Sequence, residues 1–203
     1  MDAIRARIDA LPAELAPLAD VARGLLDRPG EVSADGVLRL GHRPWVAPEN
    51  YAVTLYPGLS TDALTRYAGR FGLDVPAVYG RVLAAVNGAF LFGMGLAGVP
   101  GSMLGSPPLL DRTRLQCHDL GGTATLSAGE YRKLPAGAFA FGWRHYSFRE
   151  NVGYFVVGDR ILCLRKSGRV VGEWGGFADF LRDELPASAA LDEKLHPSGS
   201  GAS

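Results

Sequence analysis

The sequence contains little cysteine and no excess of charge of either sign. Its 203 residues include two cysteines, Cys117 and Cys163, too few for a secreted disulfide scaffold and without the paired spacing of a zinc site. We therefore expect two reduced, packed thiols. Lysine plus arginine and aspartate plus glutamate each number 21, so no net field attracts nucleic acid or an anionic membrane. Any partner must be recognised by a local surface.

Signals for secretion, membrane insertion and metal binding are also missing. The N-terminal residues, MDAIRARIDALPAEL, carry scattered charges and no continuous apolar stretch, which favours a cytoplasmic protein. Residues 82–110 contain no charged side chain, but their glycines and prolines argue against a membrane span. Histidines stand at positions 42, 118, 145 and 196 without the spacing of metal ligands. We expect no metal and no cofactor.

Two short motifs imitate known sites. Gly93-x-Gly95-x-x-Gly98 matches a dinucleotide-binding fingerprint, yet Pro100 and the residues after it exclude the helix that would face the pyrophosphate. Cys117-His118-Asp119 holds three catalytic residue types, but neighbours along a strand point to opposite faces and cannot align as a catalytic triad. Neither motif predicts an active site.

Helix signals dominate the first half of the chain. Apolar residues recur at helical spacing between Ile4 and Leu26, and Pro12 and Pro17 predict an interruption within this segment. Ser60 or Thr61 is a good cap for a helix over 61–71, which Gly72 ends in a left-handed conformation.

A second capped helix follows directly. Pro76 suits its first position, and Asn87-Gly88 can end it. An apolar strand-like stretch at 89–92 comes next. Residues 97–135 have no clear pattern, and we expect a short strand near 112–118 and a turn or one helical turn at 129–134.

Side-chain patterns with a period of two predict the strands. They occur at 37–40, 51–56, 138–143, 153–157, 160–164 and 170–174. Gly175-Gly176 then leads into a helix with an apolar stripe beginning at Phe177. Trp45, in a proline-rich segment between two strands, is either a plug over the core or an exposed interface anchor.

These elements predict an α+β fold. It has helices near the N-terminus, an antiparallel sheet of about five or six strands and one closing C-terminal helix. We divide the chain into an N-terminal helical extension with short strands (1–58), an α+β domain (59–187) and a flexible tail (188–203).

Two segments resemble a known family. Val75-Pro76-x-x-Tyr79-x-x-Val82-Leu83-x-x-x-Asn87-Gly88 resembles the signature of the SUKH superfamily, which contains bacterial immunity proteins and fungal cell-wall assembly regulators of the Smi/Knr type. Residues 153–185 resemble the closing strands, turn and Phe-x-x-Phe-Leu helix of that family. The resemblance covers about residues 60–186. It implies a non-enzymatic binding module, most often an immunity protein that occupies the functional surface of a toxin.

The candidate partner-binding site links two predicted strands. Its aromatic and charged composition is typical of protein-binding hot spots, and its residues are Trp143, Arg144, His145, Tyr146, Arg149 and Glu150. Alternatively, this segment is a solvated hairpin whose aromatic side chains fold back on the sheet. Two other functions stay open: an intracellular regulatory scaffold, and an enzyme that uses His145 and Glu150 as an acid/base pair.

Overall fold

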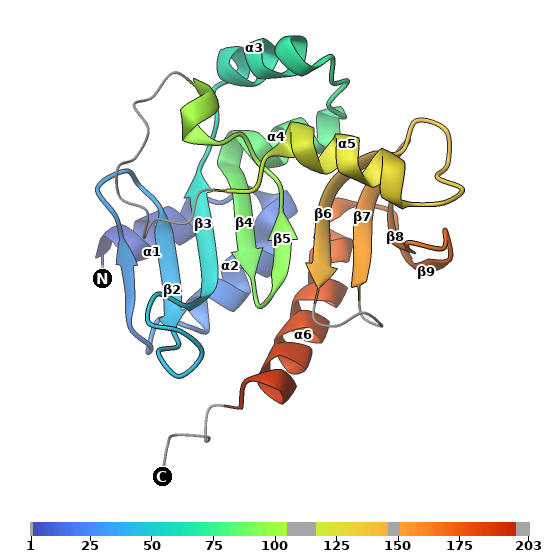
Figure 1. Ribbon diagram of the computed structural model, residues 1–203. Coiled ribbons are helices and arrows are strands. Elements are labelled where there is room, and N and C mark those ends of the chain that lie inside the picture. The colour runs from blue at the N-terminus through green and yellow to red at the C-terminus, as the bar shows by residue number, and fades with distance from the viewer. Residues whose placement is uncertain (1, 105–116, 146–150, 198–203) are drawn as a thin grey trace.

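The strands of the sheet follow one another in space in the same order as in the chain. The computed structural model describes residues 2–104, 117–145 and 151–197 (Figure 1). These ranges contain nine strands, all paired antiparallel with their neighbours. They are β1 Gly30–Val32, β2 Leu38–His42, β3 Tyr51–Pro57, β4 Val86–Leu91, β5 Met94–Leu96, β6 Phe139–His145, β7 Asn151–Val157, β8 Arg160–Arg165 and β9 Val170–Trp174.

Helices complete the α+β fold that the sequence predicts. Within the described residues they are α1 Asp2–Asp9, α2 Ala16–Arg23, α3 Thr61–Phe71, α4 Ala77–Ala85, α5 Leu120–Glu130 and α6 Phe177–Leu195, with short 3₁₀ turns η1 Ala13–Leu15 and η2 Gly101–Leu104. The break between α1 and α2 confirms the interruption predicted from Pro12 and Pro17. The expected number of strands, about five or six, was too low, because β1 and β5 have three residues each and show no alternation.

The caps of α3 are those that the sequence indicates. The side chain of Ser60 accepts a hydrogen bond from the backbone N–H of Ala63, and Gly72 adopts a left-handed conformation with φ 61°. The end of α4 differs from the prediction. The chain passes from Ala85 straight into β4, so Asn87-Gly88 lies in a strand and does not cap the helix.

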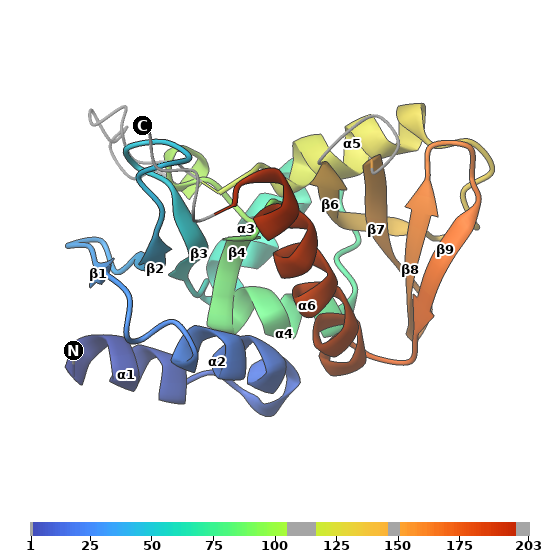
Figure 2. The ribbon, with the colours of Figure 1, turned by 90° about the horizontal axis from the view of Figure 1, so that it is seen from below.

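The two faces of the sheet are covered differently. We call the face that packs against α1, α2 and α6 the inner face, and the opposite one the outer face. Figure 2 shows α6 lying within the bend of the sheet, and it contacts both β4 and β9. Side chains of β7 alternate accordingly: Tyr154 belongs to the main core, whereas Phe155 packs on the outer face with Tyr131 and Leu162. Strand β8 is covered on both faces in the same way, with Ile161 in the main core and Leu162 on the outer face.

The closing helix is longer than expected. Its predicted apolar stripe is buried, with Phe180 and Leu185 at most 1% exposed. Beyond Pro186, α6 continues through Leu195, past the boundary that the sequence places at 187. Ser188 and Asp192 on this extension are buried polar residues, so residues 188–195 are part of the folded domain.

The segment with no clear pattern contains α5. Asp119 caps this helix by accepting a hydrogen bond from the N–H of Gly122 at 3.0 Å. At 129–134 the sequence predicts a turn or one helical turn, and the structure has the end of α5 followed by a turn there. The rest of α5 was missed, because Gly121, Gly122 and the small residues after them conceal a helical pattern. The strand expected near 112–118 falls mainly outside the described residues. Across the described ranges, the helices lack the combination of length and apolar composition that a membrane span requires.

Candidate functional site

Trp143 lies on the outer face of the sheet, in register with the strands beside it. On one side it pairs with Gly95 of β5, which in turn pairs with Phe90 of β4. The Trp143 indole lies across Gly95, where an added Cβ would clash with the ring. Glycine at this position therefore makes room for tryptophan.

The ring of His118 lies between the rings of Phe90 and Trp143. Its ring meets Trp143 edge-on, with centroids 4.4 Å apart, and meets Phe90 in the same manner at 5.2 Å. Partial burial lowers the pKa of His118, which favours the neutral ring. We call Phe90, His118 and Trp143 the aromatic row. All three side chains keep part of their surface exposed.

Arg144, the next residue of β6, points to the opposite face. Its Nη1 is 2.8 Å from Oε2 of Glu184 on α6, and the Tyr154 hydroxyl donates a hydrogen bond to the same oxygen at 2.5 Å. The side chains of Arg144 and Glu184 are only 13% and 11% exposed. Arg144 is one of the predicted partner-binding residues, and in the structure its charge pairs with Glu184 and attaches β6 to α6. A role of Arg144 in partner binding stays a prediction.

The remaining residues of the predicted site can be placed only in part. His145 is the last residue of β6, and its backbone pairs with Asn151 at the start of β7. The side chain of His145 lies outside the described part of the structure, as do residues Tyr146, Arg149 and Glu150. Their role in binding, and the acid/base pair of the enzyme alternative, stay predictions.

The side chains of Cys117-His118-Asp119 diverge. Cys117 is buried against Val37 and Tyr56, and burial raises its pKa to about 12. His118 joins the aromatic row, whereas Asp119 caps α5 and accepts a hydrogen bond from the Tyr67 hydroxyl. The three groups cannot transfer a proton along one line, as the sequence argument indicates.

The glycine fingerprint forms a hairpin between β4 and β5. Phe92 and Gly93 occupy its turn with φ values of 51° and 83°, which suits the tight connection of two antiparallel strands. Gly98 packs so closely on Asn87 that a side chain there would clash with the Asn87 backbone. These glycines serve chain packing. The described residues that follow directly, up to Leu104, form the 3₁₀ turn η2 and not the α-helix whose N-terminus faces the pyrophosphate in a dinucleotide site.

Trp45 lies at the C-terminal end of α6. It is 41% exposed, and its Nε1 donates to the backbone carbonyl of His196 at 3.4 Å. Next to it, Arg43 forms an ion pair with Asp192, and both side chains are at most 9% exposed. Of the two alternatives for Trp45, the exposed one agrees with the structure, but this surface is separate from the aromatic row.

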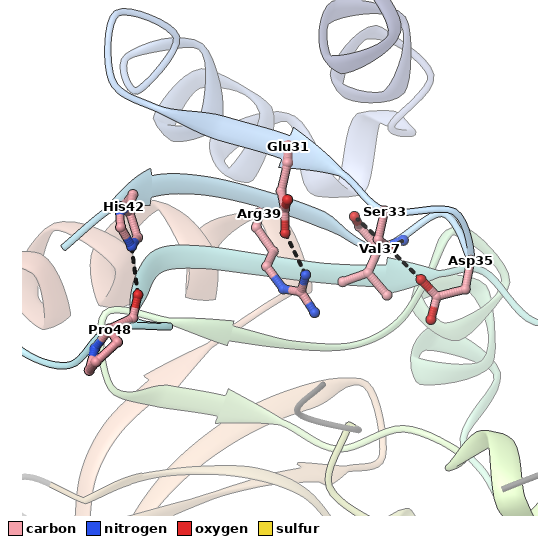
Figure 3. Close-up of polar contacts among 7 residues, drawn as sticks. All are labelled: Glu31, Ser33, Asp35, Val37, Arg39, His42 and Pro48. Atoms are coloured by element: carbon pink, nitrogen blue, oxygen red, sulfur yellow. Dashed lines mark hydrogen bonds and ion pairs between the residues drawn. The ribbon is translucent and has the colours of Figure 1, made fainter. Parts of the chain in front are cut away.

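Polar side chains around β1 and β2 form hydrogen bonds and an ion pair within this region (Figure 3). Nη1 of Arg39 is 2.6 Å from Oε1 of Glu31, which ties β1 to β2. The Nε2 atom of His42 lies 2.8 Å from the carbonyl oxygen of Pro48.

Among the described residues there is no group of three histidine, cysteine or acidic side chains that could hold a metal ion.

Sequence reasoning missed two members of the aromatic row. Phe90 belongs to an apolar strand that the sequence predicts as core, and the sequence relates His118 only to its neighbours Cys117 and Asp119. The available signal was Gly95, because a glycine inside a strand often marks the close approach of another group.

Scans of protein-family models, curated proteins and solved structures found no match to this chain.

Proposed function

We propose that this chain is a non-enzymatic protein-binding module that neutralises a cognate bacterial toxin by direct binding. Two features support the proposal. The first is the resemblance of the segments around Tyr79 and Phe180 to the SUKH superfamily. The second, which carries the proposal, is the placement of Trp143 on the outer face.

Trp143 has the properties of a binding anchor. Its indole is large and partly exposed, and contacts with Gly95 and His118 restrain its orientation before any partner arrives. A restrained tryptophan loses little side-chain entropy on binding, which is why tryptophan is enriched among hot-spot residues. The Arg144–Glu184 pair holds the same strand from the inner face. The partner thus meets a rigid part of the sheet.

The proposal predicts that a toxin domain is encoded beside this chain, and the test uses that domain. We expect a one-to-one complex by isothermal titration calorimetry, and Trp143→Ala should weaken it by more than ~1 kcal/mol, about fivefold in Kd. Trp45→Ala is the matched control, because it removes another exposed tryptophan at a separate surface and should leave the affinity unchanged. Equal affinity for the Trp143 variant and the wild type would contradict the proposed site.

A second variant separates binding from folding. His118→Ala removes the side chain that restrains Trp143, and circular dichroism should show a folded protein with weakened toxin binding. A chain that binds several cellular proteins weakly, and the neighbouring toxin not at all, would instead favour the regulatory scaffold.

A further inference from the structure

We propose that two copies of this chain pair through strand β9, joining their sheets into one antiparallel sheet. The inference does not depend on the proposed function, because β9 is separated from β6 by two strands. It rests on the exposed side chains of β9, on its rigid support and on a symmetric arrangement of its charges.

Strand β9 is an open edge. It is the last strand of the sheet, and Figure 2 shows no other described element on its far side. Val170 and Val171 are 48% and 42% exposed there. An edge strand with exposed β-branched side chains is a template for pairing with another strand.

The opposite edge is protected. Strand β1 has only three residues, follows Pro29, and its Glu31 is bound to Arg39 of β2. Short length, proline and charge are the usual means of preventing edge pairing. The contrast between the two edges points to β9 as the one available for association.

Strand β9 is already rigid in the single chain. The indole Nε1 of Trp174 donates to Oδ2 of Asp183 on α6 at 2.9 Å, and the ring packs edge-on against Phe180 with centroids 5.3 Å apart. These contacts fix the C-terminal end of the strand. A second chain can therefore add to β9 without first ordering it, which lowers the entropic cost of association.

Two charges, on Glu173 of β9 and on Arg169 just before it, favour one symmetric register. When two copies run antiparallel with Val171 opposite itself, Arg169 of each chain lies opposite Glu173 of the other. This places two opposite-charge pairs around a pair of valines, and cross-strand pairs of both kinds stabilise a sheet. Glu173 also contacts Arg160, but that pair is about half exposed and contributes little.

The bulge in β9 is compatible with this register. Val171 has no partner on β8, because the pairing moves from Cys163–Gly172 to Leu164–Val170. A bulge increases the local twist of an edge strand and often discourages pairing. Two-fold symmetry places two identical bulges opposite each other, so the twists of the two strands match.

Sedimentation equilibrium of the full chain from about 1 µM to about 500 µM tests the proposal, a range suited to a small interface. We expect a monomer–dimer equilibrium. Val171→Lys should raise the dimer dissociation constant about tenfold or more, because two like charges would then face each other. Val32→Lys, on the protected edge β1, is the matched control and should leave the constant unchanged.

A charge exchange tests the register. Arg169→Glu and Glu173→Arg should each weaken the dimer, since each places like charges opposite one another, and the double variant should restore it. A wild-type monomer at all concentrations would overturn the proposal. So would a dimer that Val171→Lys leaves intact, or single charge variants that the double variant does not rescue.

Discussion

Asn87 binds both polar groups of the Val99 backbone. Its Nδ2 donates to the Val99 carbonyl at 2.8 Å, and the Val99 N–H donates to its Oδ1 at 2.7 Å. Asn87 is 8% exposed, so these groups have little access to water. The side chain thus takes the place of a neighbouring strand, and it connects β4 to the segment that follows β5.

Replacing Asn87 should destabilise the fold. Asn87→Ala leaves two buried backbone groups of Val99 without partners, which should cost about 2–3 kcal/mol of unfolding free energy. Asn87→Gly should cost at least as much. If Asn87 instead capped α4, glycine would be a good substitute. Urea unfolding distinguishes the two roles, and an unchanged stability of Asn87→Gly would contradict the strand role.

The extension of α6 should depend on the ion pair between Arg43 and Asp192. Asp192→Asn removes the carboxylate charge that faces the buried guanidinium of Arg43, and breaking a buried pair costs about 3–5 kcal/mol. Hydrogen exchange should then accelerate between residues 187 and 195 more than in the first half of α6. Asp179→Asn breaks an exposed pair on the same helix and should change stability by less than about 1 kcal/mol. Equal effects of the two variants would contradict the role of the buried pair.

Protonation of His118 should be visible in the fluorescence of Trp143. The rings touch, and burial lowers the pKa of His118 below its usual 6.5. As the pH falls, the imidazolium should quench the indole with a midpoint below 6.5. A fluorescence titration of His118→Gln should lack this transition. A midpoint at or above the usual value would show that the ring is not held in the aromatic row.

The two cysteines should make the protein less stable in alkaline solution. Burial raises the pKa of Cys117 and of Cys163 from 9.0 to about 12. Between these values the unfolded chain releases thiol protons that the folded chain retains, so stability falls as the pH rises from about 9 to about 12. Each thiol should contribute a slope of up to about 1.4 kcal/mol per pH unit.

Substitution separates the cysteines from other alkaline effects. In Cys163→Ala, the decrease in urea-unfolding free energy between pH 9 and 10 should be smaller than in the wild type. Thiol reagents should label neither cysteine of the folded wild type at pH 8, since both side chains are buried. Rapid labelling under native conditions would contradict the burial on which the pH dependence rests.

Local chemistry accounts for the elements that the sequence predicts well. Ser60 and Gly72 mark the ends of α3 because capping depends on the residue itself and on its immediate neighbours. Strands β7, β8 and β9 are joined by short links, so their antiparallel pairing follows from the sequence. The α+β class and the closing helix follow from the same signals.

The features that sequence reasoning missed depend on contacts between distant segments. The pair Asn87-Gly88 is typical of the end of a helix. Only its contact with the Val99 backbone shows that Asn87 belongs to the sheet. Likewise, Arg144 seems a surface residue until Glu184, which is 40 residues away, is found beside it. The aromatic row arises because Phe90, Gly95 and Trp143 share a register, and register is a property of the folded sheet.

The strand order has a consequence for synthesis of the chain. Since each strand pairs with the one made just before it, the sheet can grow while the ribosome is still translating. Arg43 and Arg144 do not yet have their α6 partners at that stage, because Asp192 and Glu184 are both on α6, which emerges after β9. A nascent chain that stops short of Phe177 therefore exposes the apolar inner face that α6 covers in the folded protein, and exposed apolar surface of this kind is what chaperones bind.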